Sequence, residues 1–214
     1  MERQQFKENV ILVDADYLDS VAGDMRRNFS QFLGRQIPEA DLAEWLVCAA
    51  LDGGIPEDEK VKQAWAETEK KEAFDVQSAQ EVQVVFVRSL AKTMLQHFLP
   101  ANLLAGIDGQ AFRDPFLGEF LISVVPEEKI TGQTEPLFAE SARYLQNCSD
   151  VKRLILVPNL QKYGSIILGD LEKAEEGASV VILSMQPEEG RGFRSEILGY
   201  SLMHALGIAP EELK

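Results

Sequence analysis

Short apolar runs recur along the chain and are separated by longer, partly charged segments. Each run holds four to six residues with at most one polar residue inside it. The runs are 10–13, 82–87, 120–125, 154–157 and 180–183. Runs of this length that are apolar on both faces are typical of central strands in a parallel sheet, so the pattern predicts five buried strands.

Amphipathic periodicity predicts helices between these strands. In the first such segment, apolar residues from Val21 to Phe32 recur at intervals of three or four, which places them on one face of a helix over about 20–33. Gly34 then follows as a suitable C-terminal cap. Similar segments are expected to be helical at 38–51, 93–98, 135–147, 162–176 and 193–206. Residues 103–115 are rich in Gly and Asp and are expected to be mainly loop.

This alternation of strands and helices predicts a three-layer α/β fold with a mainly parallel, five-stranded sheet. No internal repeat and no Pro- or Gly-rich linker divides the chain, so residues 1–214 are expected to form a single domain. Residues 55–80 fit the pattern least, because their charged stretch at 67–71 is typical of a solvated face. We expect an insertion or a mobile excursion there.

An acidic excess limits the partners of the protein. The chain holds 35 Asp and Glu against 21 Lys and Arg, which gives a net charge of −14. Such a charge repels phosphate backbones and anionic lipid, so neither nucleic acid nor a membrane is supported as a partner. No apolar run approaches the roughly 20 residues that span a bilayer. The partner is therefore expected to be an unknown ligand or a protein.

Cysteine usage and the first residues favour a cytoplasmic setting. Cys48 and Cys148 are far apart and show no metal-binding or disulfide spacing, so a zinc site is not expected. The segment 1–6 is polar and lacks the apolar region of a secretory signal. Both observations fit a reducing cytoplasm.

The candidate chemistry lies at the end of the first predicted strand. In parallel sheets, ligands bind beyond the carboxyl ends of strands where the strand order reverses, which directs attention to Asp14 and to Asn159 after the fourth strand. Asp14 and Asp16 are candidate catalytic residues and candidate ligands for Mg²⁺, because this ion prefers oxygen ligands. The candidate ligand-binding residues are Asp19, Asp52 and Asn159.

A structural alternative stays open for the same carboxylates. Aspartate is a favoured residue at helix N-termini, where its side chain accepts hydrogen bonds from backbone N–H groups. Asp16 or Asp19 would then only cap the first helix. A functional site and pure capping are both compatible with the sequence.

Two segments, 10–33 and 150–164, resemble the PIN/NYN-type nuclease group. In that group an apolar strand leads into an acidic turn and a helix, and the later segment supplies further acids. The resemblance implies a strand order of 3-2-1-4-5, and Asp14 matches the first family acid. The turn at 159–162 reads Asn-Leu-Gln-Lys where the family places its acids. The resemblance therefore implies a degenerate site, and we expect no active nuclease.

The strand followed by Asp14 and Asp16 also resembles the first motif of haloacid-dehalogenase-like phosphatases. That resemblance implies that Asp14 is a nucleophile and Asp16 a general acid. Leu18 stands where Thr or Val is usual in the motif. Residues 166–170 resemble the late Gly-Asp motif of these enzymes, but the sequence around them has the pattern of a helix.

A third resemblance involves 10–17, 50–54 and 193–202, which are similar to an uncharacterised family of Bacteroidetes proteins. It implies a bacterial cytoplasmic protein and no particular reaction.

Three hypotheses about function follow from the sequence. The first is a degenerate PIN/NYN-like domain that binds a ligand or partner at the carboxyl end of strand one. The second is a Mg²⁺-dependent nuclease or phosphatase that uses Asp14 and Asp16. The third is an assembly protein that forms a homo-oligomer through the closing helix or 55–80.

Overall fold

The computed structural model describes residues 6–67, 77–127, 136–174 and 177–213. Seven strands form one sheet in the spatial order β5-β6-β3-β1-β7-β8-β9. All neighbouring pairs are parallel except β5 and β6. The strands are β1 (Asn9–Asp14), β3 (Glu81–Ser89), β5 (Ala111–Asp114), β6 (Gly118–Glu127), β7 (Arg153–Val157), β8 (Ser179–Ser184) and β9 (Arg194–Ile197).

The five predicted strands are present as β1, β3, β6, β7 and β8, and they lie in the order 3-2-1-4-5. The prediction of a five-stranded sheet is nevertheless wrong, because β5 and β9 extend the sheet at its two edges. Edge strands do not need an apolar run, since one of their sides lacks a neighbouring strand. β5 alternates between exposed and half-buried residues, and β9 holds no fully buried residue.

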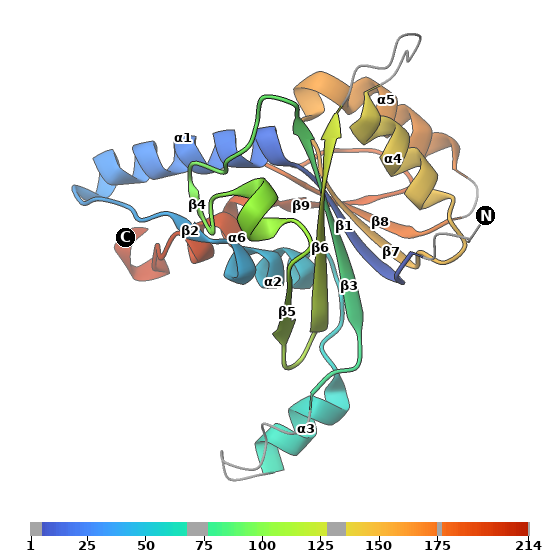
Figure 1. The fold of residues 1–214 in the computed structure, drawn as a ribbon, viewed down its shortest axis with the longest axis horizontal. Helices are drawn as coiled ribbons and strands as arrows, with labels where there is room; N and C mark the ends of the chain where they lie inside the picture. The colour runs from blue at the N-terminus through green and yellow to red at the C-terminus, as the bar shows by residue number, and fades with distance from the viewer. Residues whose placement is uncertain (1–5, 68–76, 128–135, 175–176, 214) are drawn as a thin grey trace.

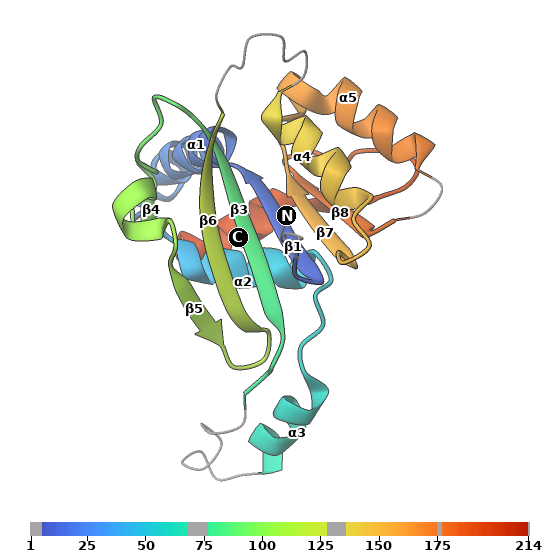
Figure 2. The same ribbon diagram turned by 45° about the vertical axis from the view of Figure 1, so that its right-hand side comes forward.

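Helices cover both faces of the sheet (Figures 1 and 2). The helices α1 (Ala15–Leu33), α2 (Leu42–Asp52) and α6 (Leu198–Ala205) pack on one face, and α4 (Leu137–Gln146) and α5 (Leu160–Lys173) on the other. Side chains of β1 point alternately to the two faces: Ile11 and Val13 join the first core, and Val10 and Leu12 the second. All four are fully buried, and each contributes about 1.5–3 kcal/mol of hydrophobic stabilisation.

The first helix begins five residues earlier than its periodicity predicts. It starts at Ala15, directly after β1, because the Asp14 carboxylate accepts a hydrogen bond from the backbone N–H of Tyr17 at 2.9 Å. The helix ends as expected, with Gly34 in the left-handed conformation at φ 63°. α2, by contrast, begins later than predicted: it starts at Leu42 rather than near Pro38, and Asp41 is its capping residue.

The segment between β3 and β6 differs most from the prediction. Residues 93–98 form no helix: Met94 makes an isolated antiparallel bridge with Asn102, and β4 (Phe98–Leu99) pairs with β2 (Ala40–Asp41) in a small second sheet. A single π-helical turn, η2 (Leu103–Ile107), follows. The closing helix expected at 193–206 is shorter than predicted, because its first residues form β9 and the helix α6 begins only at Leu198.

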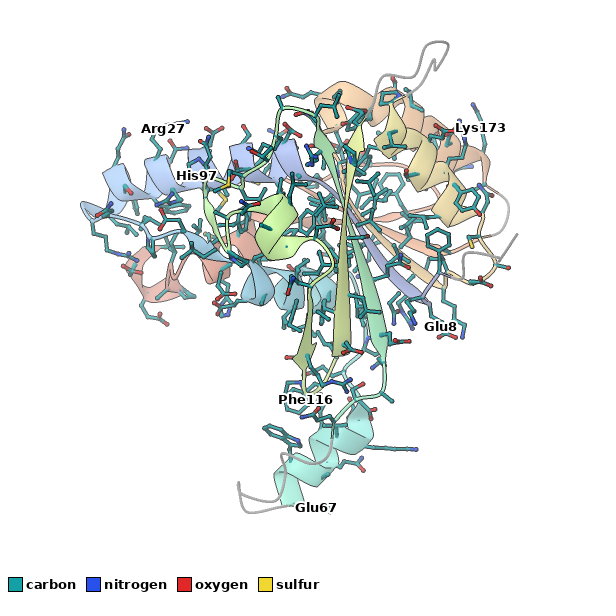
Figure 3. The ribbon with its side chains drawn as sticks, viewed as in Figure 1. Glu8, Arg27, Glu67, His97, Phe116 and Lys173 are labelled. Atoms are coloured by element: carbon teal, nitrogen blue, oxygen red, sulfur yellow. The ribbon has the colours of Figure 1, made fainter. Side chains whose placement is uncertain are left out.

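A short helix, α3 (Glu59–Glu67), lies beyond the end of the sheet (Figure 1). Its Trp65 ring contacts the Phe116 ring edge-on at 5.2 Å, and Figure 3 shows Phe116 near the start of α3 with Glu67 at its far end. Residues 68–76 lie outside the described residues. The expected insertion or excursion at 55–80 therefore stays a prediction, as does the single domain. A 3₁₀ turn, η3 (Pro210–Leu213), ends the described chain.

Candidate functional site

The candidate site lies at the carboxyl edge of the sheet, between β1 and β7. α1 follows β1 on one face and α5 follows β7 on the other, so this is the point where the strand order reverses. Two of the predicted site residues cap these helices. Asp14 caps α1, and the Asn159 side chain caps α5 by accepting a hydrogen bond from the backbone N–H of Lys162 at 3.3 Å.

Asp14 is buried, with 5% of its surface exposed, and it is held by a second donor. The Tyr163 hydroxyl, from α5, donates a hydrogen bond to Asp14 Oδ2 at 2.6 Å. Burial raises the pKa of Asp14 above its ordinary value, although the hydrogen bonds from Tyr163 and Tyr17 oppose that rise. Burial and the neighbouring carboxylate raise the pKa of Tyr163 as well, so the phenol keeps its proton.

Lys162 brings a positive charge to this pair. Its Nζ atom lies 2.9 Å from the Tyr163 hydroxyl oxygen and 3.1 Å from Glu127 Oε2 on β6. The ammonium therefore links a carboxylate on β6 to the buried carboxylate on β1 through a tyrosine. About half of the Lys162 side chain is exposed, so its charged end remains in contact with solvent.

The Asp16 side chain contacts β3, the strand that pairs with β1 on the side opposite β7. Its carboxylate accepts two hydrogen bonds from Ser89 at the end of β3, from the backbone N–H at 2.8 Å and from the hydroxyl at 2.7 Å. Asp16 thereby ties the first turn of α1 to the carboxyl end of β3. It is not the helix cap that the sequence allowed.

Asp19 is almost fully buried and holds the loop after β3. It forms an ion pair with Lys92 and accepts a hydrogen bond from the backbone N–H of His97 at 2.9 Å. The three carboxylates therefore contact different elements: Asp14 contacts α5, Asp16 contacts β3, and Asp19 contacts the loop after β3. Within the described ranges, no group of three or more His, Cys, Asp and Glu residues is placed to hold a metal ion.

Asp52 belongs to a different part of the molecule. It is the last residue of α2, and its backbone carbonyl accepts a hydrogen bond from Arg194 Nη2 at 2.9 Å. Burial and the nearby Glu196 raise the pKa of its carboxyl group. Its described contacts connect α2 to β9 rather than to Asp14.

Sequence reasoning found Asp14, Asp16 and Asn159 but missed their partners. Ser89 gave no signal because a serine at a strand end is common. Lys162 and Tyr163 lie in the segment that resembles the PIN/NYN group, yet the contact of Tyr163 with Asp14 depends on the sheet bringing β7 beside β1. Charge complementarity between an acidic turn and a lysine in the corresponding later turn is the signal that could have revealed it.

Fold and site together define an α/β protein with a mostly parallel sheet, whose acidic turn is engaged by protein donors. The chain matches the model of a family of unknown function (DUF6621) over residues 3–213, and it belongs to that family. No curated protein and no solved structure is significantly similar to it. Among the helices of the described ranges, none combines the length and the apolar character needed to cross a membrane.

Proposed function

We propose that the protein is a non-catalytic, PIN/NYN-like binding domain, which holds a ligand or a partner segment at the carboxyl end of β1. One observation carries this proposal: the Lys162 ammonium lies between Glu127 and the Tyr163–Asp14 pair. Lys162, from the same chain, offsets part of the negative charge of this edge, which supports a site that needs no divalent cation.

The strand order and the two helix starts support the PIN/NYN-like layout. β1 leads through an acidic turn into α1, and β7 leads through Asn159 into α5, as the resemblance implies. Residues 159–162 contribute an amide cap and an ammonium at the turn where that group has acids. The bacterial cytoplasmic setting follows from the sequence resemblance and from the cysteine usage, and it stays a prediction.

A Mg²⁺-dependent nuclease or phosphatase fits the contacts less well. Each carboxylate oxygen of Asp14 and Asp16 already accepts a hydrogen bond, so the ion would compete with the donors on Tyr17, Tyr163 and Ser89. Leaving a buried donor unsatisfied costs about 1–3 kcal/mol, and Mg²⁺ also demands near-ideal octahedral geometry. The nearby ammonium of Lys162 adds direct repulsion of a divalent cation.

Thermal unfolding with added metal tests the absence of a cation site. We expect Mg²⁺ and Mn²⁺ to shift the melting temperature of the wild-type protein no more than NaCl at equal ionic strength, since a ligand stabilises only the state that binds it. A larger shift that is lost in Asp14→Asn would contradict the proposal and favour the metal-dependent enzyme. Lys162→Ala is the matched variant, because it removes the internal cation and should increase any response to Mg²⁺.

Amide NMR spectra test where small molecules bind. We would add a mixture of small carboxylates, phosphates and aromatic amines, and follow the backbone signals. Binding at the carboxyl edge predicts shifts that gather on Ser89, Asn159 and Lys162. Shifts that gather on another region, such as α3, would contradict the proposed location.

A further inference from the structure

The segment after β3 exposes an unusual share of the large apolar side chains. Among the described residues, eleven large hydrophobic side chains are exposed, and four of them lie within 90–104. They are Leu90 (59% exposed), Met94 (41%), Leu99 (57%) and Leu104 (49%). Single exposed apolar residues are normal on a protein surface, whereas several on one short segment mark an interaction site. We call residues 89–104 the apolar segment.

The apolar segment also lacks the charge that covers the rest of the molecule. Residues 82–107 contain neither Asp nor Glu, the longest such run in a chain with 35 acidic residues. The two basic residues of the segment are engaged within the protein: Lys92 pairs with Asp19, and His97 Nδ1 lies 2.9 Å from Arg26 Nη1. Depletion of charged residues is the compositional mark of the centre of a protein interface.

Charged side chains fix the backbone at the start of the apolar segment, ahead of the Met94–Asn102 bridge and β4. The Nη1 atom of the largely buried Arg88 donates to the backbone carbonyls of Ser89, Leu90 and Lys92, each at 3.0 Å. Asp16 holds Ser89 from the side of α1. Figure 3 shows His97 beside α1, and Figure 2 shows β4 at the outer edge of the molecule.

A fixed surface of this kind is prepared for binding. A partner that docks on it does not have to order the loop, so less conformational entropy is lost on association. Asp16 and Asp19 therefore have a second consequence beside the candidate ligand site: they hold a surface that exposes four large apolar side chains and no acid.

We propose that the apolar segment binds the same segment of a second copy of the chain, so that the protein forms a symmetric dimer. Two molecules that each carry a charge of −14 repel one another over most of their surfaces. A two-fold contact through the acid-free segment keeps the acidic surfaces apart while it buries apolar side chains on both sides. A strongly charged partner would find no complementary free charge on this surface.

Sedimentation or light scattering of the full chain tests the dimer directly. Over roughly 1–100 µM protein, the range of micromolar association, we expect the mass to rise from 23.9 kDa towards twice that value. Raising NaCl from about 0.05 M to about 0.5 M should strengthen the association, since salt screens repulsion and leaves apolar contacts intact. A protein that remains at 23.9 kDa throughout would overturn the proposal.

Charge insertion locates the contact. The double substitution Met94→Glu with Leu104→Glu places acids on two exposed positions, and we expect at least about tenfold weaker association. The matched control is Tyr144→Glu with Tyr200→Glu, which adds the same charge at two exposed positions on α4 and α6. If the control weakens the dimer as much as the test variant does, the apolar segment is not the interface.

Hydrogen exchange in the unmodified protein gives a readout that needs no variant. The backbone amides of 90–104 should become better protected as the protein concentration rises through the association range. Protection that increases only in other regions, while the mass doubles, would place the interface elsewhere and overturn the proposal.

Discussion

The hydrogen bond from the Tyr163 hydroxyl to the buried Asp14 carboxylate can be tested by a single substitution. Tyr163→Phe removes the hydroxyl that donates to Asp14 and accepts from Lys162. The Asp14 carboxylate then keeps only the backbone N–H of Tyr17 as a donor. We expect the free energy of unfolding at neutral pH to fall by about 1–3 kcal/mol, the usual cost of an unmet buried polar group. Urea denaturation measures this change.

The pH dependence of that loss has a definite sign. Because the folded-state pKa of Asp14 is raised, the cost of burying its charge is absent below the unfolded pKa and grows as the pH rises through the folded value. Tyr163→Phe removes a hydrogen bond that opposes the rise, so its effect should be larger at neutral pH than in acid. Tyr144→Phe, at an exposed position, should change stability by less than about 0.5 kcal/mol at either pH. An equal loss in both Tyr163→Phe and Tyr144→Phe would contradict this account.

Sequence reasoning identified the right carboxylates but gave the capping role to the wrong ones. Periodicity placed the first helix at about residue 20, so Asp14 stood too far from the helix to cap it. The helix begins at Ala15, where Asp14 caps it, and its first turn is buried against the core, as the fully buried Leu18 shows. The contact between Asp14 and Tyr163 joins residues 149 positions apart, and no local pattern can indicate it.

At the scale of elements, the end of α2 packs on the sheet with no space for a side chain at Gly53. A Cβ atom there would lie 2.1 Å from Ile155 Cδ1 on β7. Gly53→Ala should therefore lower the free energy of unfolding by about 1–3 kcal/mol, the range for overpacking a core. In an Ile155→Ala background the added methyl has space. We expect the double variant to be more stable than the sum of the two single losses by about 0.5–3 kcal/mol.

Gly169, in the interior of α5, provides the matched control for that prediction. A Cβ atom at this position would meet no atom within 4 Å. Gly169→Ala should raise the free energy of unfolding by about 0.5–1 kcal/mol, because glycine loses more backbone freedom on helix formation than alanine. Denaturation of both variants under one set of conditions tests the pair. Additive energies in the Gly53–Ile155 cycle would show that the close approach does not limit packing.

The central elements were predictable from the sequence and the peripheral ones were not. Strands such as β1 and β7 are buried on both faces, so their composition alone distinguishes them. β9 reads Arg-Ser-Glu-Ile and pairs with β8 only because it lies at the edge beside it. Its residues precede the apolar pattern of α6 without a break, so periodicity assigned them to the helix.

The end of the described chain is fastened by an ion pair that NMR can test. Arg35, just after α1, donates to both carboxylate oxygens of Glu212 in η3, at 2.7 and 2.8 Å. This contact holds the pKa of Glu212 at about 2. A lowered folded pKa stabilises the protein above the unfolded value, and that contribution is lost as the pH falls through about 2.

Carboxyl ¹³C titration should therefore find the midpoint of Glu212 near 2 in the wild-type protein. Arg35→Gln removes the guanidinium, and the midpoint should return towards the ordinary value of 4.5. Both side chains are partly exposed, so the global melting temperature should change little. A midpoint that Arg35→Gln leaves unchanged would show that the ion pair does not persist in solution.

At the scale of the whole molecule, repulsion among acidic side chains opposes the compact state. The net charge of −14 is spread over a surface whose ion pairs are mostly exposed and therefore weak. Raising NaCl from about 0.05 M to about 0.5 M shortens the Debye length from more than 10 Å to less than 5 Å. Screening then reduces repulsion in the folded state more than in the expanded unfolded chain, so calorimetry should show a higher melting temperature.

Charge substitutions test the same repulsion, because they change how strongly the melting temperature depends on NaCl. Lys173→Glu, at the end of α5, makes the molecule more acidic and should steepen the rise of the melting temperature with NaCl. Glu172→Lys, at the adjacent position, should flatten it because the net charge moves towards zero. Both side chains lie near the C-terminus of α5, where a cation is favoured. At low salt, Lys173→Glu should therefore lower the melting temperature and Glu172→Lys should raise it. Equal salt slopes in the two variants would show that local contacts, rather than net charge, govern the response.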